Sequence, residues 1–485
     1  MDEISWYALT AVALHWSAVV GFSMRVVMRR RPVGVLLAWI AIILSVPVVG
    51  ILLYLFIGEN RVSKKYLRRS EAIHVQYLQW KQSLSRHYDV DLSRLGPEAI
   101  PLQQQAQSLF GFPVLPGNRV ELLTDYESAF RSLVRDIRQC QSSCHLEFYI
   151  WHAGGLVDEV CAALFDAAKR GVSCRVLLDA VGSKPFLKSA AVARFREAGI
   201  ELGVSLPVGP LTALLSRADL RNHRKVVVID GEIAYTGSQN LVDPRFFKQD
   251  EGVGQWIDAM VRIEGPAVEA FAGSFIQDWE VVTGVGFEYF EGTSDLKQLD
   301  ARGEALVQLV PSGPQPKPLA ILQLVLGTIY SARRELIITT PYFIPDESVL
   351  SALVSAAHRG VEVTVIIPEK NDSRLVDYAS RAVFDDLLSE GVRIAAFKGG
   401  LLHTKSISVD GEYCLFGSLN LDMRSLWLNF EVSLFIYDQA LVAQIRELQI
   451  EYLRDADLID PVACRQRPLP QRFAENAVHL LAPLL

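Results

Sequence analysis

An eighteen-residue pattern in the second quarter of the chain returns 180 residues later. The first copy reads Asn222-His223-Arg224-Lys225-Val226-Val227-Val228-Ile229-Asp230-Gly231, followed by Gly237-Ser238-Gln239-Asn240. The second copy reads His403-Thr404-Lys405-Ser406-Ile407-Ser408-Val409-Asp410-Gly411, followed by Gly417-Ser418-Leu419-Asn420. Both copies obey H-x-K-x4-D-G-x5-G-S-x-N. A single His-x-Lys is expected by chance, but two copies of the whole pattern indicate a duplicated unit.

The sequence around each motif repeats as well. Residues 170–178 match residues 359–367, and each segment reads as the end of a helix, a glycine and a buried strand. Upstream, residues 146–150 correspond to residues 336–340 as another short apolar strand. Strand and helix patterns alternating at this spacing predict an α/β domain that is used twice. We therefore expect a site at the boundary between the copies.

Strand geometry brings the motif residues together. Residues two apart on a strand face the same way, so the histidine and the lysine of each pair share one face. Asp-Gly predicts a two-residue hairpin turn, and the resulting register places Ser238 across from His223 and Ser418 across from His403. The candidate catalytic set is His223, Lys225, Asp230, His403, Lys405 and Asp410. Each aspartate lies an odd number of residues after the histidine and the lysine, so on a regular strand its side chain faces the other way. We therefore expect a structural role for the two aspartates rather than contact with substrate, unless a bulge intervenes.

These side chains suit displacement at a phosphodiester. The lysines, together with Ser238, Asn240, Ser418 and Asn420, make a set of donors for phosphate oxygens. One histidine can attack phosphorus while the other protonates the leaving oxygen, because both forms of imidazole are accessible near neutral pH. Each histidine needs an acceptor for its second ring nitrogen, and Asp258 and Glu431 occupy matching positions in the repeats. We expect neither a metal nor a cofactor.

The N-terminal region is predicted to be embedded in a membrane. Ile4 to Met24 and Pro32 to Gly58 are two uncharged runs, each longer than the ~20 residues that cross a bilayer as a helix. We read them as a two-helix transmembrane hairpin over residues 1–60. Basic residues lie both in the turn between the runs and after the second run, so the positive charges do not decide the orientation. The six cysteines have no zinc or disulfide spacing, which favours a cytoplasmic body.

The remaining organisation follows from composition. Residues 61–117 are polar and are predicted to be a helical connector, followed by repeat domains at 118–298 and 299–485. Near the C-terminus an amphipathic stripe lies on the membrane or packs on the body, and packing is the favoured alternative. Its residues are Phe473, Ala477, Leu480, Leu481 and Leu484. The formal net charge of −7 gives no support to a nucleic-acid partner.

The paired string resembles the signature of the phospholipase D superfamily. Two features, Thr340-Pro341-Tyr342-Phe343-Ile344-Pro345 and Asp422-Met423-Arg424-Ser425 with Asn429 and Glu431, make the chain similar to the bacterial cardiolipin synthases that use phosphatidylglycerol. The resemblance implies two phospholipase D-like α-β-α sandwich domains packed with pseudo-twofold symmetry. It also implies a multi-pass protein of the bacterial inner membrane that joins two phosphatidylglycerols into cardiolipin and glycerol through a phosphatidyl-histidine, by analogy on His223.

Three alternatives remain open at this stage. A membrane-bound phospholipase D would transfer the same group to water and release phosphatidic acid. A nuclease of the same superfamily is disfavoured by the membrane segment and the acidic balance. A degenerate lipid-binding or scaffolding protein is disfavoured because both motifs are intact. The sequence does not decide which histidine is the nucleophile, or whether the chain forms a homo-oligomer.

Overall fold

The computed structural model describes residues 2–29, 33–59, 61–209, 217, 219–290, 293–314 and 317–482. By internal contacts the chain forms two units, residues 1–68 with 207–220, and residues 69–206 with 221–485.

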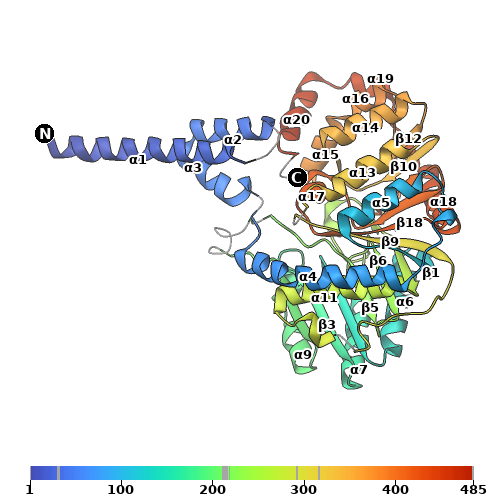
Figure 1. Ribbon diagram of the computed structural model, residues 1–485. Helices are drawn as coiled ribbons and strands as arrows, with labels where there is room; N and C mark the ends of the chain where they lie inside the picture. Colours follow the sequence, from blue (N-terminus) through green and yellow to red (C-terminus); the bar gives the residue numbers. More distant parts are fainter. Residues whose placement is uncertain are drawn as a thin grey trace. The chain divides into compact units, whose positions relative to one another are not determined.

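The larger unit is built on one fifteen-stranded sheet whose strand order repeats. Figure 1 shows the two halves of this unit, with β9 and β1 between them. The first half contributes, in spatial order, β1 (Val114–Leu123), β8 (Met260–Glu264), β6 (Ile233–Gly237), β5 (Val226–Ile229), β2 (Ser143–Phe148), β3 (Ser173–Asp179) and β4 (Glu201–Ser205). The second half contributes β9 (Ala305–Ser312), β18 (Glu431–Ile436), β16 (Tyr413–Gly417), β15 (Ser406–Val409), β10 (Glu335–Thr339), β12 (Glu362–Pro368), β13 (Arg393–Phe397) and β19 (Ala456–Leu458). The first seven strands of the two halves correspond one to one.

The halves join through their equivalent first strands. β1 and β9 pair antiparallel, with Val114 opposite Gln308 and Asn118 opposite Ala305. Antiparallel pairing of equivalent strands relates the two halves by a pseudo-twofold axis. The predicted duplicated α/β architecture is therefore confirmed.

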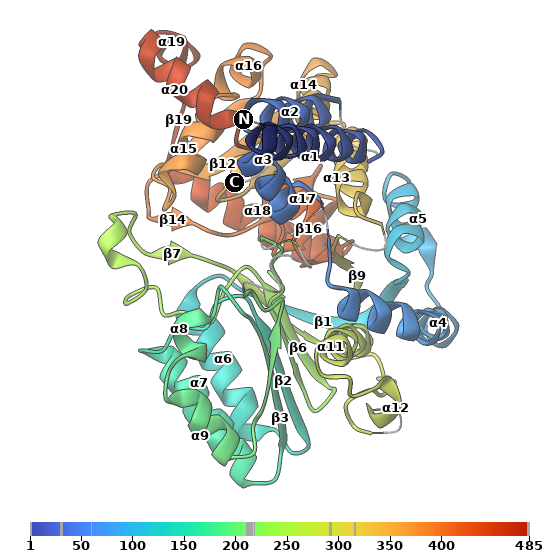
Figure 2. The same cartoon turned by 90° about the vertical axis from the view of Figure 1, so that its left-hand side faces the viewer.

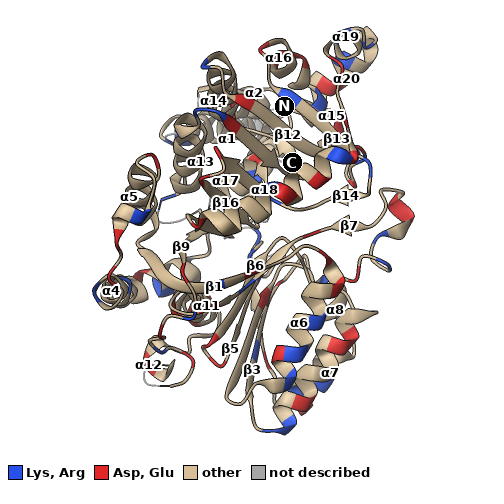
Figure 3. Cartoon of the chain, turned by 90° about the vertical axis from the view of Figure 1, so that its right-hand side faces the viewer, with Lys and Arg blue, Asp and Glu red and all other residues tan. Residues whose placement is uncertain are grey.

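Helices cover both faces of each half-sheet. In the first half α6 (Tyr126–Gln139), α7 (Leu156–Lys169) and α9 (Ala191–Glu197) lie on one face and α11 (Ala267–Thr283) on the other (Figure 2). Their counterparts in the second half are α13 (Ala320–Ser331), α14 (Glu347–His358), α16 (Phe384–Ser389) and α18 (Gln439–Arg454). Acidic and basic residues both occur along α6 and α7, as expected for helices with a solvent-facing surface (Figure 3).

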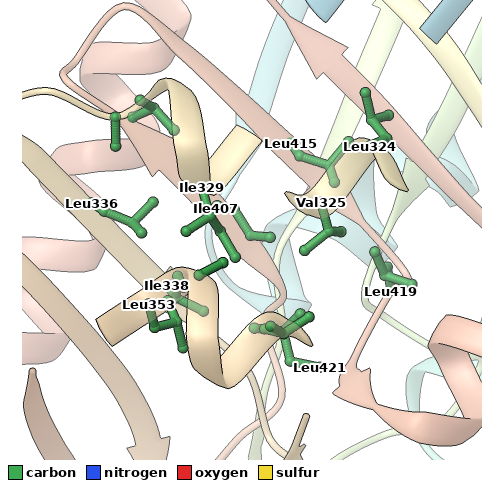
Figure 4. Packing of buried hydrophobic residues seen from close by; sticks show 14 of the residues in the cluster. Leu324, Val325, Ile329, Leu336, Ile338, Leu353, Ile407, Leu415, Leu419 and Leu421 are labelled. Atoms are coloured by element: carbon green, nitrogen blue, oxygen red, sulfur yellow. The ribbon is translucent and has the colours of Figure 1, made fainter. Parts of the chain in front are cut away.

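Apolar side chains between these layers form the cores. In the second half Leu324 and Val325 of α13 pack with Leu336 and Ile338 of β10 and with Ile407 of β15 (Figure 4). The strands read as continuous apolar runs because both of their faces are covered. At about 25 cal/mol per Å² of apolar area removed from water, such burial is the main stabilising term of the fold.

The region expected as a connector packs on this body. α4 (Lys64–His87) lies over α11, where Trp80 occupies the space above Gly273 and Arg69 donates to the carbonyls of Val281 and Val282. α5 (Ala99–Phe110) contributes buried residues to the core of the second half. Short elements complete the unit: η2 (Leu92–Arg94), α8 (Lys184–Leu187), η3 (Gln249–Glu251), β7 (Trp256–Ile257), α12 (Phe287–Phe290), β11 (Phe343–Ile344), α15 (Arg374–Arg381), β14 (Leu401–Leu402), β17 (Leu421–Asp422), α17 (Met423–Trp427), α19 (Pro461–Arg465) and α20 (Leu469–His479).

The C-terminal stripe departs from the favoured expectation. Phe473 of α20 is 76% exposed and Leu480 is 81% exposed, while Ala482 is buried against α15. The stripe therefore does not pack on the body as a continuous face, because the buried side of α20 is the one that carries Glu475 and Val478. Leu484 lies outside the described residues.

The N-terminal unit contains one helix that is long enough to cross a bilayer. α1 (Asp2–Val27) includes the apolar segment Trp6–Val27, and no other described helix passes the same test of length and composition. The second apolar run is divided into α2 (Val33–Ser45), α3 (Pro47–Leu53) and η1 (Tyr54–Gly58). The second run is therefore not one continuous helix, since Pro47 ends the regular backbone hydrogen bonding of α2.

Candidate active site

Each motif forms a hairpin that begins just after its lysine. β5 pairs with β6, and β15 pairs with β16. Asp230 and Gly231 have φ of 52° and 60°, and Asp410 and Gly411 have φ of 54° and 71°. Two successive positive φ values define the predicted tight turn, in which aspartate and glycine are the favoured residues.

The register of these hairpins differs from the prediction by one residue. Ile229 pairs with Ile233 rather than with Glu232, whose N–H instead donates to the carbonyl of Ile229 at 2.9 Å. The second hairpin has the same offset, with Val409 opposite Tyr413. One extra residue after the turn is a bulge, so the predicted placement of Ser238 across from His223 and of Ser418 across from His403 is wrong.

The two motif aspartates stabilise the fold at the far end of the hairpins. The Asp230 carboxylate accepts the backbone N–H groups of Gln141, Ser142 and Ser143 at 2.7–2.9 Å. Asp410 accepts those of Arg333, Arg334 and Glu335 at 2.7–2.9 Å. Neither aspartate lines the cavity that holds the histidines. The prediction that they belong to the catalytic set is therefore wrong, and both have the structural role that their position on the strand favoured.

Replacing these aspartates should cost stability rather than catalysis. Asp230→Ala leaves three backbone donors without their charged acceptor, and we expect a loss of about 2–4 kcal/mol in the free energy of unfolding. Burial raises the pKa of Asp230, but the backbone donors outweigh it and lower the pKa. This contribution is therefore present above the unfolded pKa of about 4 and is lost as pH falls through the folded value. Thermal unfolding between pH 3 and pH 7 measures both effects.

The control for this experiment is Glu197→Ala, on the exposed side of α9. It should change the unfolding temperature by less than about 1 °C. Full stability of Asp230→Ala combined with loss of turnover would contradict the structural assignment.

A cavity of about 480 Å³ contains both histidines. Both lysines line it, together with Asn240, Ser418 and Asn420. The structure thus brings together segments of two halves that are far apart in the sequence. Ser238 is fully buried and does not line the cavity; its hydroxyl donates to the carbonyl of Ala259 and accepts the N–H of the same residue.

Each histidine is held by a carboxylate from the opposite half. Nδ1 of His403 lies 2.6 Å from Oδ1 of Asp258, and Nδ1 of His223 lies 3.2 Å from Oε1 of Glu431. Asp258 and Glu431 are themselves buried. Because Nδ1 is engaged on both rings, Nε2 is the nitrogen left to react in the cavity.

Backbone pairing between the halves produces this exchange. β7, which precedes Asp258, pairs in parallel with β14, which precedes His403. The N–H of His403 donates to Ile257 O at 2.8 Å, and the N–H of His223 donates to Phe430 O at 2.8 Å. The carbonyl group of the residue before each acid therefore accepts the backbone N–H of the histidine in the other half.

The acids are kept ionised by their surroundings. Burial alone raises the pKa of Asp258, but His403 and Lys405 outweigh it and lower the pKa to about 2. Burial is likewise outweighed at Glu431, whose pKa is lowered by His223 and Lys225. Ser418 donates its hydroxyl to Glu431 at 2.6 Å and so positions the acid. A carboxylate that stays charged can stabilise a protonated imidazole.

The lysines are buried beside the histidines. Lys225 donates to the carbonyl of His223 at 2.6 Å, and Lys405 donates to that of His403. Burial lowers the pKa of Lys225 to about 8, against the opposing effect of Glu431 and Asp258, and also lowers the pKa of Lys405. Two ammonium groups next to two histidines make a strong site for an anionic phosphodiester.

The lysine environment predicts an alkaline limit to activity. Only the protonated ammonium attracts phosphate, and Lys225 loses its proton as pH rises through about 8. We expect kcat/KM to fall above that pH, because this ratio reports ionisations of the free enzyme. Lys225→Arg keeps the charge at all accessible pH values and should remove the limb near pH 8, at a lower overall rate. An unchanged limb in this variant would assign it to another group.

Several cavity residues escaped the sequence interpretation. The ring of Tyr149 lies 4.1 Å from that of His223, and the ring of Trp256 lies 4.4 Å from that of His403. Asp372 accepts from Lys248 at 3.1 Å and from the Tyr342 hydroxyl at 3.0 Å. Lys248 and Asp372 lie in different halves, so no local spacing signals their contact. Among the described residues, no group of three or more His, Cys, Asp or Glu side chains could hold a metal ion.

Comparison with known proteins identifies the fold. The family model "Cardiolipin synthase, PLD-like domain" matches residues 133–279 and 325–451, and "Phospholipase_D-nuclease N-terminal" matches residues 18–59. The crystal structure of phosphatidylserine synthase from Haemophilus influenzae Rd KW20 covers 79% of this chain and 100% of its own, with a TM-score of 0.59 at 16% identity. The fold is thus that of phospholipase D-like proteins.

Relatives that match the full length of the chain identify its family within the superfamily. Cardiolipin synthase A of Edwardsiella ictaluri is 42% identical over 482 residues, which covers 99% of both chains. Cardiolipin synthase A of Yersinia pseudotuberculosis shows the same identity and coverage. The chain belongs to the cardiolipin synthase family of the phospholipase D superfamily.

Proposed function

We propose that this protein transfers a phosphatidyl group from one phosphatidylglycerol to a second, giving cardiolipin and glycerol. The observation that carries this proposal is the single cavity with two His/Lys pairs, each histidine backed by a buried carboxylate. The name shared by relatives that match the full length of the chain supports the choice of product.

The first step forms a covalent intermediate. Nε2 of one histidine, by the family resemblance His223, attacks phosphorus as a neutral imidazole and forms a P–N bond. The P–O bond to glycerol breaks, and His403 gives its proton to the departing oxygen. Lys225, Lys405 and the cavity amides bind the non-bridging oxygens, where charge is held through the transition state.

The second step regenerates the enzyme. A hydroxyl of a second phosphatidylglycerol attacks phosphorus, His403 removes its proton, and the P–N bond to His223 breaks. One phosphodiester replaces another, so the reaction needs no external energy source. Asp258 stabilises the imidazolium that His403 becomes in this step, and Glu431 does the same for His223 when the intermediate forms.

The walls of the cavity favour a lipid acceptor over water. Tyr149, Trp151, Phe247, Trp256 and Val376 line it beside the charged groups. An apolar lining excludes water from the intermediate and accommodates the glycerol backbone of a lipid. We propose phosphatidylglycerol and cardiolipin as the lipids bound, with no nucleic-acid partner.

We place the protein in the bacterial inner membrane with its body facing the cytoplasm. All six cysteines are free, and five of them are buried. Free thiols are the usual state in the reducing cytoplasm. Within the body, we propose residues 118–298 and 299–485 as the two domains.

Product analysis tests the proposed reaction. Purified protein is incubated with phosphatidylglycerol in mixed micelles, and lipids and free glycerol are quantified by mass spectrometry. We expect cardiolipin and glycerol in equal amounts. Phosphatidic acid and glycerol without cardiolipin would show a hydrolase, and would overturn the proposal.

A further inference from the structure

The second apolar segment of the N-terminal unit is too short in either arm to cross a bilayer. α2 has 13 residues and extends about 20 Å at the helical rise of ~1.5 Å per residue. The helix Pro47–Gly58 extends about 18 Å. The hydrocarbon core is about 30 Å thick, and only Trp6–Val27, with 22 residues, matches it.

The chain turns back between these arms. Val46 leaves the helical conformation with φ −136° and ψ 73°, and Pro47 follows. A Cβ built on Gly50 would lie 2.7 Å from the carbonyl oxygen of Ile42, eight residues earlier. In a continuous helix these residues would be about 12 Å apart along the axis. The helices Val33–Ser45 and Pro47–Gly58 therefore fold against each other and are in contact at Gly50.

The turn is suited to a membrane interior. The N–H of Val46 donates to Ile42 O at 3.0 Å, and that of Gly50 donates to Val46 O at 2.6 Å. Pro47 has no N–H to satisfy. Backbone groups of a segment that stops inside the bilayer must be bonded within the protein, and these two hydrogen bonds satisfy the N–H groups of Val46 and Gly50.

The second arm returns to the end of α1. Glu59 is 4% exposed and binds Nε of Arg25 at 2.7 Å and Nη2 of the same residue at 2.9 Å, with Arg29 in contact. The Tyr54 hydroxyl donates to Glu59 at 3.0 Å, and its ring lies 6.5 Å from Phe22 and 5.4 Å from Trp39. Glu59 therefore lies beside the C-terminal end of α1.

We propose that the chain crosses the membrane once, through α1, and that residues 33–58 form a re-entrant hairpin that enters and leaves through one face. The N-terminus and everything after Glu59 then lie on opposite sides of the bilayer. Outward-facing apolar residues of both arms, such as Leu37 at 60% and Val48 at 65% exposure, contact lipid.

This topology also decides the orientation. With two spans, the basic clusters at residues 25–31 and 61–69 would face opposite sides and cancel. With a re-entrant hairpin they lie on the same side, against Asp2 and Glu3 on the other. That side carries Arg25, Arg29, Arg30, Arg31, Arg61, Lys64, Lys65, Arg68 and Arg69. By the positive-inside rule it is the cytoplasmic side.

Side-specific thiol labelling tests this proposal without reference to activity. Asp2→Cys and Glu159→Cys, the latter on the exposed face of α7, are each made in a full-length Cys161→Ala chain, where the other native cysteines are buried. A membrane-impermeant maleimide is added to intact spheroplasts of a bacterial host and, separately, to lysed ones.

We expect Asp2→Cys to be labelled in intact spheroplasts and Glu159→Cys only after lysis. Labelling of both residues from the same side would show that the second segment spans the bilayer and would overturn the re-entrant hairpin. Labelling of Glu159→Cys alone in intact spheroplasts would overturn the orientation. A C-terminal green fluorescent protein fusion gives a second measurement of the body, because it fluoresces only in the cytoplasm.

Discussion

His223→Ala and His403→Ala are each expected to lower the rate of phosphatidyl transfer by at least about 10⁴-fold. One histidine supplies the nucleophile and the other moves the proton, so neither half of the chain can work alone. The double variant should be little worse than either single one, because residues that act as a unit lose their effect together. Initial rates of cardiolipin formation from phosphatidylglycerol measure all three variants.

His358→Ala is the matched control, since this histidine is exposed and its ring is hydrogen-bonded to Glu390, outside the cavity. Its rate should remain within about twofold of the parent. Transfer at more than a tenth of the parent rate in either cavity variant would contradict a mechanism that needs both imidazoles. Unfolding curves that overlay the parent would show that the loss is chemical.

Asp258→Asn and Glu431→Gln should each lower kcat by on the order of 10³-fold, with little change in the unfolding temperature. Each change keeps the shape of the side chain and removes the charge that stabilises a histidinium across the boundary between the halves. The measurement is kcat and KM for phosphatidylglycerol over a range of pH.

The conservative variants distinguish positioning from structure. Asp258→Glu and Glu431→Asp retain a carboxylate and should recover part of the rate, whereas a purely structural role would make them as damaging as the amides or worse. A rise in KM with unchanged kcat would instead indicate that the acids bind substrate. Either of those results would contradict their assignment to the histidines.

The sequence predicted the duplicated fold and most of the cavity because the motif carries that information locally. His223, Lys225, Asn240 and their counterparts follow from one repeated string, and the Asp-Gly turns follow from residues that favour positive φ. The register was wrong by one residue because Glu232 forms a bulge, and nothing in its residue type signals one.

Long-range pairing was beyond sequence reasoning. Matching positions identified Asp258 and Glu431, but not that each serves the histidine of the opposite half. That exchange depends on β7 pairing with β14, two strands of two residues each. The contact of Lys248 with Asp372 likewise joins loops from both halves.

The membrane segment shows a different limit of sequence reasoning. The apolar run from Pro32 to Gly58 has enough residues to span, and a hydropathy count cannot distinguish one long helix from two short ones. Pro47 and Gly50 are the available signals of a break, and proline is tolerated in many membrane helices. The salt bridge between Glu59 and Arg25 favours two short helices, because it brings the end of the second run back to the end of α1. A contact between residues 34 positions apart cannot be read from hydropathy.

Trapping the covalent intermediate tests the central claim most directly. Wild-type protein is mixed with phosphatidylglycerol and quenched within milliseconds in alkali, where a phosphoramidate survives, and its peptides are analysed by mass spectrometry. The mechanism predicts a phosphatidyl adduct on the peptide that contains His223, absent from His223→Ala and formed at the rate of glycerol release. Continued turnover with no adduct on any histidine would contradict covalent phosphatidyl transfer.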